Sequence, residues 1–114
     1  ICASSRGLAK GCANSLGQEG VELFINGTNR ENLNKTEEEF LKKGYKVQAV
    51  LGPIEEESTR IALLSACPDP DILINNSGGP PPGNFFDWTE QDFISAIKSI
   101  SLIQHYLCNR SFLR

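Results

Sequence analysis

Short apolar segments alternate with helical segments along this chain, and this alternation restricts the folds that it can adopt. The apolar segments are rich in β-branched residues and are bounded by turn residues: Val21–Asn26, Tyr45–Leu51 and Asp71–Asn75. We expect each of them to form a strand. A helical pattern precedes each strand: Gly7–Glu19, Arg30–Lys43 and about Glu56–Cys67. Strands separated by helices in this way run parallel, so the sequence predicts an α/β fold with a parallel sheet.

The two ends of the chain carry further elements. Ile1-Cys2-Ala3 resembles the last part of a strand, and the first strand of a parallel α/β sheet lies in its middle. Near the other end, Thr89 and Asp92 can cap a helix start reciprocally, which predicts a long amphipathic helix. Its apolar residues recur every three or four positions on one stripe: Phe93, Ile97, Ile100 and then Ile103 or Leu107. The chain contains no methionine, which we interpret as the mark of a fragment.

The composition is that of one ordinary domain. The chain has 114 residues and a net charge of -3, and its lysines and arginines form no stripe that could follow a nucleic-acid backbone. It has no run of about 18 apolar residues and no secretory signal pattern. We therefore expect a cytoplasmic protein that binds neither nucleic acid nor membranes. The cysteines and the single histidine have no metal-ligand spacing, so we expect no metal site.

The turn near the start of the chain is the first candidate site. Ala3-Ser4-Ser5-Arg6-Gly7-Leu8-Ala9 lies between a strand end and a helix start. Free backbone N–H groups and the helix dipole favour a pyrophosphate at such a place, and small residues let the backbone approach it. Ser/Gly turns before helices are also common without any ligand, so this turn alone does not distinguish a nucleotide site from a plain connection.

Two further turns support the nucleotide interpretation. Asn26-Gly27-Thr28 ends the strand after the first helix, and Asn75-Asn76-Ser77-Gly78 follows the last predicted strand. The order and separation of the three motifs are similar to those of the short-chain dehydrogenase/reductase family, and to its 3-oxoacyl reductase-like members. The resemblance implies a Rossmann-like doubly wound parallel sheet, truncated at both ends. Residues 1–114 would then form a partial dinucleotide-binding domain in which most of the first strand is missing and the second half is absent.

The resemblance also implies which residues bind the cofactor: Ala3, Ser4, Ser5, Arg6, Gly7, Leu8, Thr28, Ile54, Asn76 and Gly78. We expect NADP rather than NAD, because Gly27-Thr28-Asn29 contains no acid to repel a 2′-phosphate. The Arg6 guanidinium can also pair with that phosphate. An exposed loop arginine is an equal alternative for Arg6, and an ordinary core position is an alternative for Ile54.

The chain departs from the family pattern in its cofactor motifs. The family's glycine turn is Gly-x-x-x-Gly-x-Gly, and this chain matches only the middle glycine, at Gly7. Alanine stands at the outer two positions, Ala3 and Ala9. The family usually has an Asp beside the adenine, where this chain has Pro53. We expect the methyl group of Ala3 to be tolerated, whereas Ala9 can crowd the helix against the strand or the nucleotide, so we expect a reduced nucleotide affinity. Pro53 cannot accept the hydrogen bond that the family's Asp accepts.

The catalytic residues that the resemblance implies are not found. The family uses a Tyr with a Lys four residues later, together with a Ser, for acid catalysis on a carbonyl. Here Tyr45 is followed four places on by Ala49, and Tyr106 by Arg110. Ile100 stands where the family has a helix asparagine. We therefore assign no catalytic residue, and whether the chain is an enzyme by itself stays open.

Three functions remain open at this stage. The first is a fragment of an NADP-dependent oxidoreductase acting on a small carbonyl or alcohol substrate, with this chain supplying the nucleotide-binding half. The second is a non-catalytic remnant or nucleotide-binding module. The third is an association element, because the last helix resembles the one that pairs subunits in this family, whose members form homo-oligomers. The proline-rich loop Gly79–Gly83 is either part of a substrate pocket or a rigid surface connection.

Overall fold

The computed structural model describes residues 1–78 and 82–112. Its elements are α1 (Gly7–Gln18), β1 (Leu23–Gly27), α2 (Arg30–Lys42), β2 (Val47–Leu51), α3 (Glu57–Ala66), the 3₁₀ helix η1 (Phe85–Asp87), α4 (Glu90–Ile97), the π-helical turn η2 (Lys98–Leu102) and α5 (Ile103–Phe112). The predicted helices and the first two predicted strands are present, with ends that differ by one or two residues. Most of the proline-rich loop, residues 79–81, lies outside the described residues. Within the described ranges, no helix combines the length and the hydropathy of a membrane span.

The strands form a parallel sheet around the first residues of the chain. β1 pairs with β2 in parallel, with Leu23 opposite Val47. Residues 1–4, called the first segment below, lie along the other edge of β1. The Asn26 N–H donates to the Ile1 carbonyl at 3.2 Å, and the Ser4 N–H donates to the Asn26 carbonyl at 2.7 Å. The first segment thus lies inside the sheet, as predicted.

A regular strand at Asp71–Asn75 was predicted, and that prediction is wrong. This stretch runs beside the first segment without regular strand pairing. One backbone hydrogen bond joins the two, from the Cys2 N–H to the Ile74 carbonyl at 3.0 Å. A ladder needs several successive bonds, and the first segment is too short to supply them. The paired strands of the described chain are therefore β1 and β2, with the first segment beside β1 and residues 72–76 beside the first segment.

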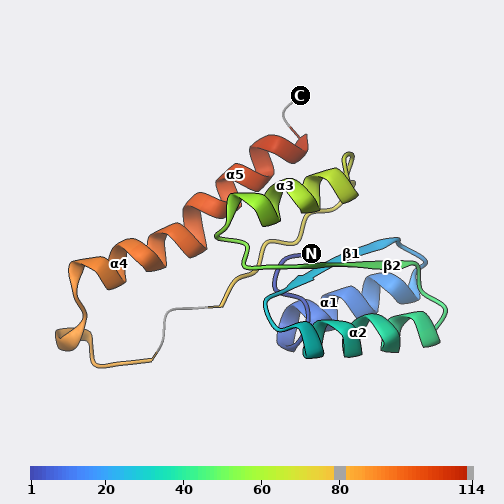
Figure 1. Cartoon of the computed structure of the whole chain (residues 1–114), viewed down its shortest axis with the longest axis horizontal. Helices are drawn as coiled ribbons and strands as arrows, with labels where there is room; N and C mark the ends of the chain where they lie inside the picture. The colour runs from blue at the N-terminus through green and yellow to red at the C-terminus, as the bar shows by residue number, and fades with distance from the viewer. Residues whose placement is uncertain (79–81, 113–114) are drawn as a thin grey trace.

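Helices cover both faces of this sheet. α1 and α2 lie on one face, and α3 and α5 lie on the other (Figure 1). The core under α1 and α2 consists of Ala13, Leu23, Ile25, Leu33 and Phe40. The core under α3 and α5 consists of Cys2, Ile54, Leu63 and Leu107. The arrangement is the doubly wound α/β architecture, in which ligands bind beyond the carboxyl ends of the strands.

The last helix begins as predicted but packs differently along its length. Thr89 and Asp92 form the reciprocal capping box at the start of α4. α4 extends away from the sheet (Figure 1), so Phe93, Ile97 and Ile100 stay 41%, 55% and 41% exposed. Leu107 of α5 is buried against the sheet. The predicted stripe is therefore covered only at its far end, and the side chain of its Ile103 position lies outside the described residues.

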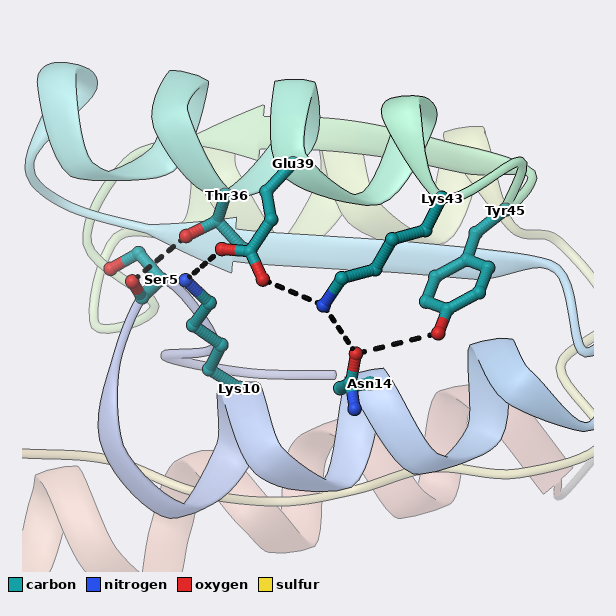
Figure 2. A network of polar contacts seen from close by, with 7 residues as sticks. All are labelled: Ser5, Lys10, Asn14, Thr36, Glu39, Lys43 and Tyr45. Atoms are coloured by element: carbon teal, nitrogen blue, oxygen red, sulfur yellow. Dashed lines mark hydrogen bonds and ion pairs between the residues drawn. The ribbon is translucent and has the colours of Figure 1, made fainter.

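A polar network joins α1 to α2 (Figure 2). The Glu39 carboxylate accepts hydrogen bonds from Lys10 of α1 at 2.6 Å and from Lys43 at 2.8 Å. Lys43 also donates to the Asn14 side-chain carbonyl at 2.8 Å. The hydrogen bonds from Lys10 and Lys43 lower the pKa of Glu39 to about 2. The network lies beside the turn that follows the first segment and ties α1 to α2 (Figure 2).

The Glu39 network predicts a specific pH dependence of stability. A carboxylate whose pKa is lower in the folded state stabilises the fold above its unfolded pKa, and this contribution is lost as the pH falls through the folded value. We expect the free energy of unfolding to fall between about pH 4.5 and pH 2 by less in Glu39→Gln than in the parent chain. Denaturant unfolding at both pH values measures it. Glu38→Gln, an exposed neighbour on α2, serves as the control, and equal slopes for all three proteins would contradict the prediction.

Candidate functional site

A cavity of about 420 Å³ opens at the carboxyl ends of the strands. Three chain segments that are distant in sequence line it: the turn into α1, the end of β1 and the stretch after Ile74. A fourth contribution comes from the turn that follows β2. The lining residues are Ala3, Ser5, Arg6, Gly7, Leu8, Asn26, Gly27, Thr28, Ile54, Glu55, Asn76, Ser77 and Gly78.

The turn into α1 has a backbone shaped by two positive φ angles. Gly7 has φ +62°, and a Cβ built there would meet no atom within 4 Å. Ala3 has φ +46° and is the one non-glycine residue with positive φ among the described residues. The left-handed conformation costs an L-residue about 1–2 kcal/mol. Backbone strain of this kind is typical of functional sites, where the surrounding structure holds the residue in place.

Ser4 lies behind the cavity and holds the turn in place. It is fully buried, and its hydroxyl donates to the Ile1 carbonyl at 2.9 Å. The same oxygen accepts the Asn26 N–H at 3.0 Å. The Ser4 hydroxyl therefore both donates and accepts a hydrogen bond inside the protein. Of the ten predicted cofactor residues, Ser4 is the one that does not line the cavity.

Ser5 and Gly27 bring the turn close to the end of β1. A Cβ built on Gly27 would lie 2.9 Å from the Ser5 hydroxyl oxygen and 3.0 Å from its Cβ, so no larger residue fits without moving the turn. On the other side, the buried Thr36 hydroxyl of α2 donates to the Ser5 carbonyl at 3.0 Å (Figure 2). Ser5 is thus held between β1 and α2.

The start of α1 leaves donors available to a ligand. The Arg6 side chain makes no capping hydrogen bond, so the first N–H groups of α1 are free to bind an anion. The Arg6 guanidinium is exposed on the cavity wall and makes no hydrogen bond or ion pair with any other described residue. Leu8, 87% exposed, offers an apolar surface beside them. Backbone donors, one free cation and an apolar contact therefore meet at one place.

Residues beyond the turn complete the wall. Asn76 approaches the turn from the far side, with its amide nitrogen 3.5 Å from the Ala3 carbonyl oxygen. Thr28 is exposed at the end of β1. Ile54 is 5% exposed, so it belongs to the core as well as to the cavity wall. The core interpretation of Ile54 is therefore confirmed, and its contact with a nucleotide stays a prediction.

Sequence reasoning missed four lining residues: Asn26, Gly27, Glu55 and Ser77. Each adjoins a residue that was predicted or belongs to the same turn motif. Asn26 is the most consequential of them. It is 2% exposed, and its amide nitrogen donates to the Val50 carbonyl at 3.0 Å and to the Gly52 carbonyl at 2.9 Å. Its position at a strand end, directly before a glycine, was a signal that the motif already contained.

Neither tyrosine of the chain lines the cavity. The Tyr45 ring packs against Phe40, with ring centroids 5.6 Å apart. The Tyr106 ring lies under the Arg60 guanidinium, 4.8 Å from it, with Arg110 at 5.7 Å. The cavity wall therefore provides groups that bind and orient a ligand, with no phenol among them.

Comparison with known proteins agrees with this geometry. The family model described as short chain dehydrogenase matches residues 1–114. The chain belongs to the short-chain dehydrogenase family. It is 31% identical over 118 residues to the uncharacterized oxidoreductase YvaG of Bacillus subtilis, covering 96% of this chain and 44% of that protein. It is 29% identical over 82 residues to a diacetyl reductase of Staphylococcus epidermidis, covering 68% and 32%.

Solved structures of short-chain dehydrogenases share the fold. The NADPH-dependent reductase YwfH, involved in bacilysin biosynthesis, matches with a TM-score of 0.87 and 25% identity, over 97% of this chain and 46% of that one. The L-sorbose reductase of Gluconobacter frateurii, complexed with NADPH and L-sorbose, matches with a TM-score of 0.88 and 18% identity, over 97% and 44%. The fold is thus the predicted Rossmann-like one. The chain spans less than half the length of these relatives.

The strained turn predicts a stabilising substitution. Ala3→Gly removes the left-handed strain but adds entropy to the unfolded chain, so we expect a net gain of about 0.5–1 kcal/mol in the free energy of unfolding. Denaturant unfolding measures it. Ala62→Gly in the exposed middle of α3 is the matched control and should lose about 0.5–1 kcal/mol. A loss of similar size at both positions would show that Ala3 is not strained.

Proposed function

We propose that this chain supplies the nucleotide-binding half of an NADP(H)-dependent oxidoreductase that acts on a small carbonyl or alcohol substrate. The observation that carries the proposal is the cavity at the carboxyl ends of the strands. There, the free N–H groups of α1, the Arg6 guanidinium and the Asn76 amide converge on one space. When bound, the nicotinamide exchanges a hydride with the substrate, while this chain holds and orients the nucleotide.

The cavity wall offers backbone donors and the Arg6 guanidinium to a dinucleotide phosphate, and one carboxylate, that of Glu55, also lines it. In the turn from Ala3 to Gly7, Ala3 and Ser5 are small and Gly7 has no side chain, which allows an anion to approach the backbone donors. The side chain of Ile54 provides an apolar wall suited to one face of an adenine. Pro53 has no side-chain acceptor for the adenine amino group, so the fit there rests on apolar contact.

NADP is proposed over NAD because of the charges near the end of β1. Thr28 and Asn29 carry no carboxylate that would repel a 2′-phosphate, and Arg6 stands free on the cavity wall. The family member YwfH, described as NADPH dependent, supports the same choice. The diacetyl reductase among the relatives supports a carbonyl substrate.

Nucleotide binding by the purified chain tests this proposal. We expect NADPH to bind, with a dissociation constant in the micromolar to millimolar range, and NADH to bind less tightly. Arg6→Gln should weaken NADPH binding by roughly tenfold, or about 1.4 kcal/mol, and leave NADH binding nearly unchanged. Fluorescence titration of the reduced cofactor measures both.

The control is Lys46→Gln, which removes one exposed positive charge at the amino end of β2, whereas the cavity lies at the carboxyl ends of the strands. It should leave both affinities unchanged. Equal weakening of NADPH and NADH by Arg6→Gln would refute the role given to Arg6. Absence of any binding at millimolar NADPH would refute the nucleotide site itself.

The second candidate is a nucleotide-binding module without oxidoreductase activity of its own. The placement of Tyr45 and Tyr106 away from the cavity favours it, because the described cavity wall then has no phenol to donate a proton. Consumption of NADPH in the presence of diacetyl separates the two candidates. Turnover by this chain alone would exclude the module, whereas binding without turnover would favour it.

We also propose that α4 mediates association between copies of the protein. Exposed apolar side chains lie along α4 and the adjoining η1 and η2: Phe85, Phe86, Phe93, Ile94, Ile97 and Ile100. Exposed apolar surface of this kind favours protein contacts. Homo-oligomers paired through this helix are therefore the proposed assembly of the complete protein.

A further inference from the structure

A turn between β2 and α3 contributes to the wall of the nucleotide cavity. It comprises residues 53–56 and is closed by a hydrogen bond from the Glu56 N–H to the Pro53 carbonyl at 3.0 Å. Its two central residues, Ile54 and Glu55, line the cavity. We call it the wall turn. Contacts that fix the wall turn therefore also fix this side of the cavity.

The sheet holds the residue before the wall turn. The Gly52 N–H donates to the Gly27 carbonyl at 3.0 Å, and the Gly52 carbonyl accepts from the Asn26 amide nitrogen at 2.9 Å. Among the described residues, no hydrogen bond from a strand reaches Ile54 or Glu55. The hydrogen bonds that hold the backbone of these two residues therefore come from outside the sheet.

Arg60 of α3 supplies these hydrogen bonds. Its guanidinium Nη1 donates to the Ile54 carbonyl at 2.9 Å and to the Glu55 carbonyl at 2.7 Å. Hydrogen bonds from a charged donor are stronger than those between neutral groups. The Arg60 Nε is buried and has no hydrogen-bond partner within the described ranges. Both hydrogen bonds of this guanidinium in the described chain therefore go to the wall turn.

An aromatic ring on α5 holds the guanidinium in turn. The centroid of the Tyr106 ring lies 4.8 Å from the Arg60 Cζ, within the range of a cation–π contact. Tyr106 also packs against the core under α3 and α5, and these two helices lie side by side (Figure 1). A continuous series of contacts therefore runs from α5 through Tyr106 and Arg60 to the cavity wall.

We propose that Arg60, supported by Tyr106, is a positioning residue of the nucleotide cavity that keeps the wall turn where Ile54 meets the adenine. This inference rests on the proposed nucleotide function. Arg60 is not among the described residues that line the cavity, so it acts through the backbone of the wall turn. It therefore affects the adenosine end of a bound nucleotide and leaves the anion site at the start of α1 unchanged.

Two ligands distinguish these parts of the cavity: adenosine 2′,5′-bisphosphate, which carries the adenine, and inorganic pyrophosphate, which lacks it. We expect Arg60→Met to weaken binding of the bisphosphate about fivefold, through loss of the charged hydrogen bonds to the wall turn, and to leave pyrophosphate binding unchanged. Isothermal titration calorimetry measures both. Arg110→Met is the matched control, because Arg110 is exposed and its Cζ lies 5.7 Å from the centroid of the same ring. It should change neither affinity.

Substitutions of Tyr106 test its support of Arg60. Tyr106→Phe keeps the ring and should keep the parent affinity, whereas Tyr106→Leu should weaken bisphosphate binding about threefold. Combining Tyr106→Leu with Arg60→Met should weaken it no further than Arg60→Met alone, because both changes remove the same contact. Additive losses would overturn the role given to Tyr106.

Amide hydrogen exchange measures the wall turn without a ligand. Exchange at Glu56, whose N–H closes the turn, should be roughly fivefold faster in Arg60→Met than in the parent chain. Exchange at Gly44, in the turn after α2, should be equal. Arg60→Lys keeps the charge without the planar fork, so it should show smaller effects of the same kind, and it replaces Arg60→Met if that variant does not fold.

The outcomes separate this inference from the proposed function. Unchanged exchange at Glu56, or equal weakening of bisphosphate and pyrophosphate binding by Arg60→Met, would overturn the role of Arg60 while the parent chain still binds both ligands. Failure of the parent chain itself to bind either ligand would refute the nucleotide site, and this inference with it.

Discussion

The buried side chain of Asn26 holds together the segments whose ends form the nucleotide cavity. Its amide nitrogen binds the Val50 and Gly52 carbonyls, and its oxygen accepts the Ala3 N–H at 3.3 Å. The Asn26 N–H also donates to the Ile1 carbonyl, and the Asn26 carbonyl accepts the Ser4 N–H, so the Asn26 backbone joins β1 to the first segment. A buried amide whose donors and acceptor are all paired is costly to disturb, because each lost bond leaves a desolvated group unpaired. The positions of the α1 turn and of the turn after β2 both depend on it.

The fold was predictable wherever the signal was local. Helix α2 begins at the Asn29 cap and α4 at the Thr89–Asp92 capping box, and both are readable from neighbouring residues. Asp71–Asn75 carries the composition of a strand, but a strand also requires a paired neighbour, and the first segment offers one bond. Likewise, the periodicity of α4 showed an apolar face without showing what covers it. Among the stripe positions whose side chains the structure describes, Leu107 of α5, over the sheet, is the buried one.

The candidate site was also predictable only where short sequence motifs indicated it. The motifs located the turn, the end of β1 and the Asn76 segment, because parallel strands bring their carboxyl ends to one edge. The motifs did not show that Ser4 differs from its neighbours. The Ser4 hydroxyl is hydrogen-bonded to Ile1 and Asn26, whereas the neighbouring residues line the cavity. Nor did the motifs show why Gly27 must be small, since its contact with Ser5 spans more than twenty residues of sequence. Distances across the sheet decide such details, and sequence spacing does not contain them.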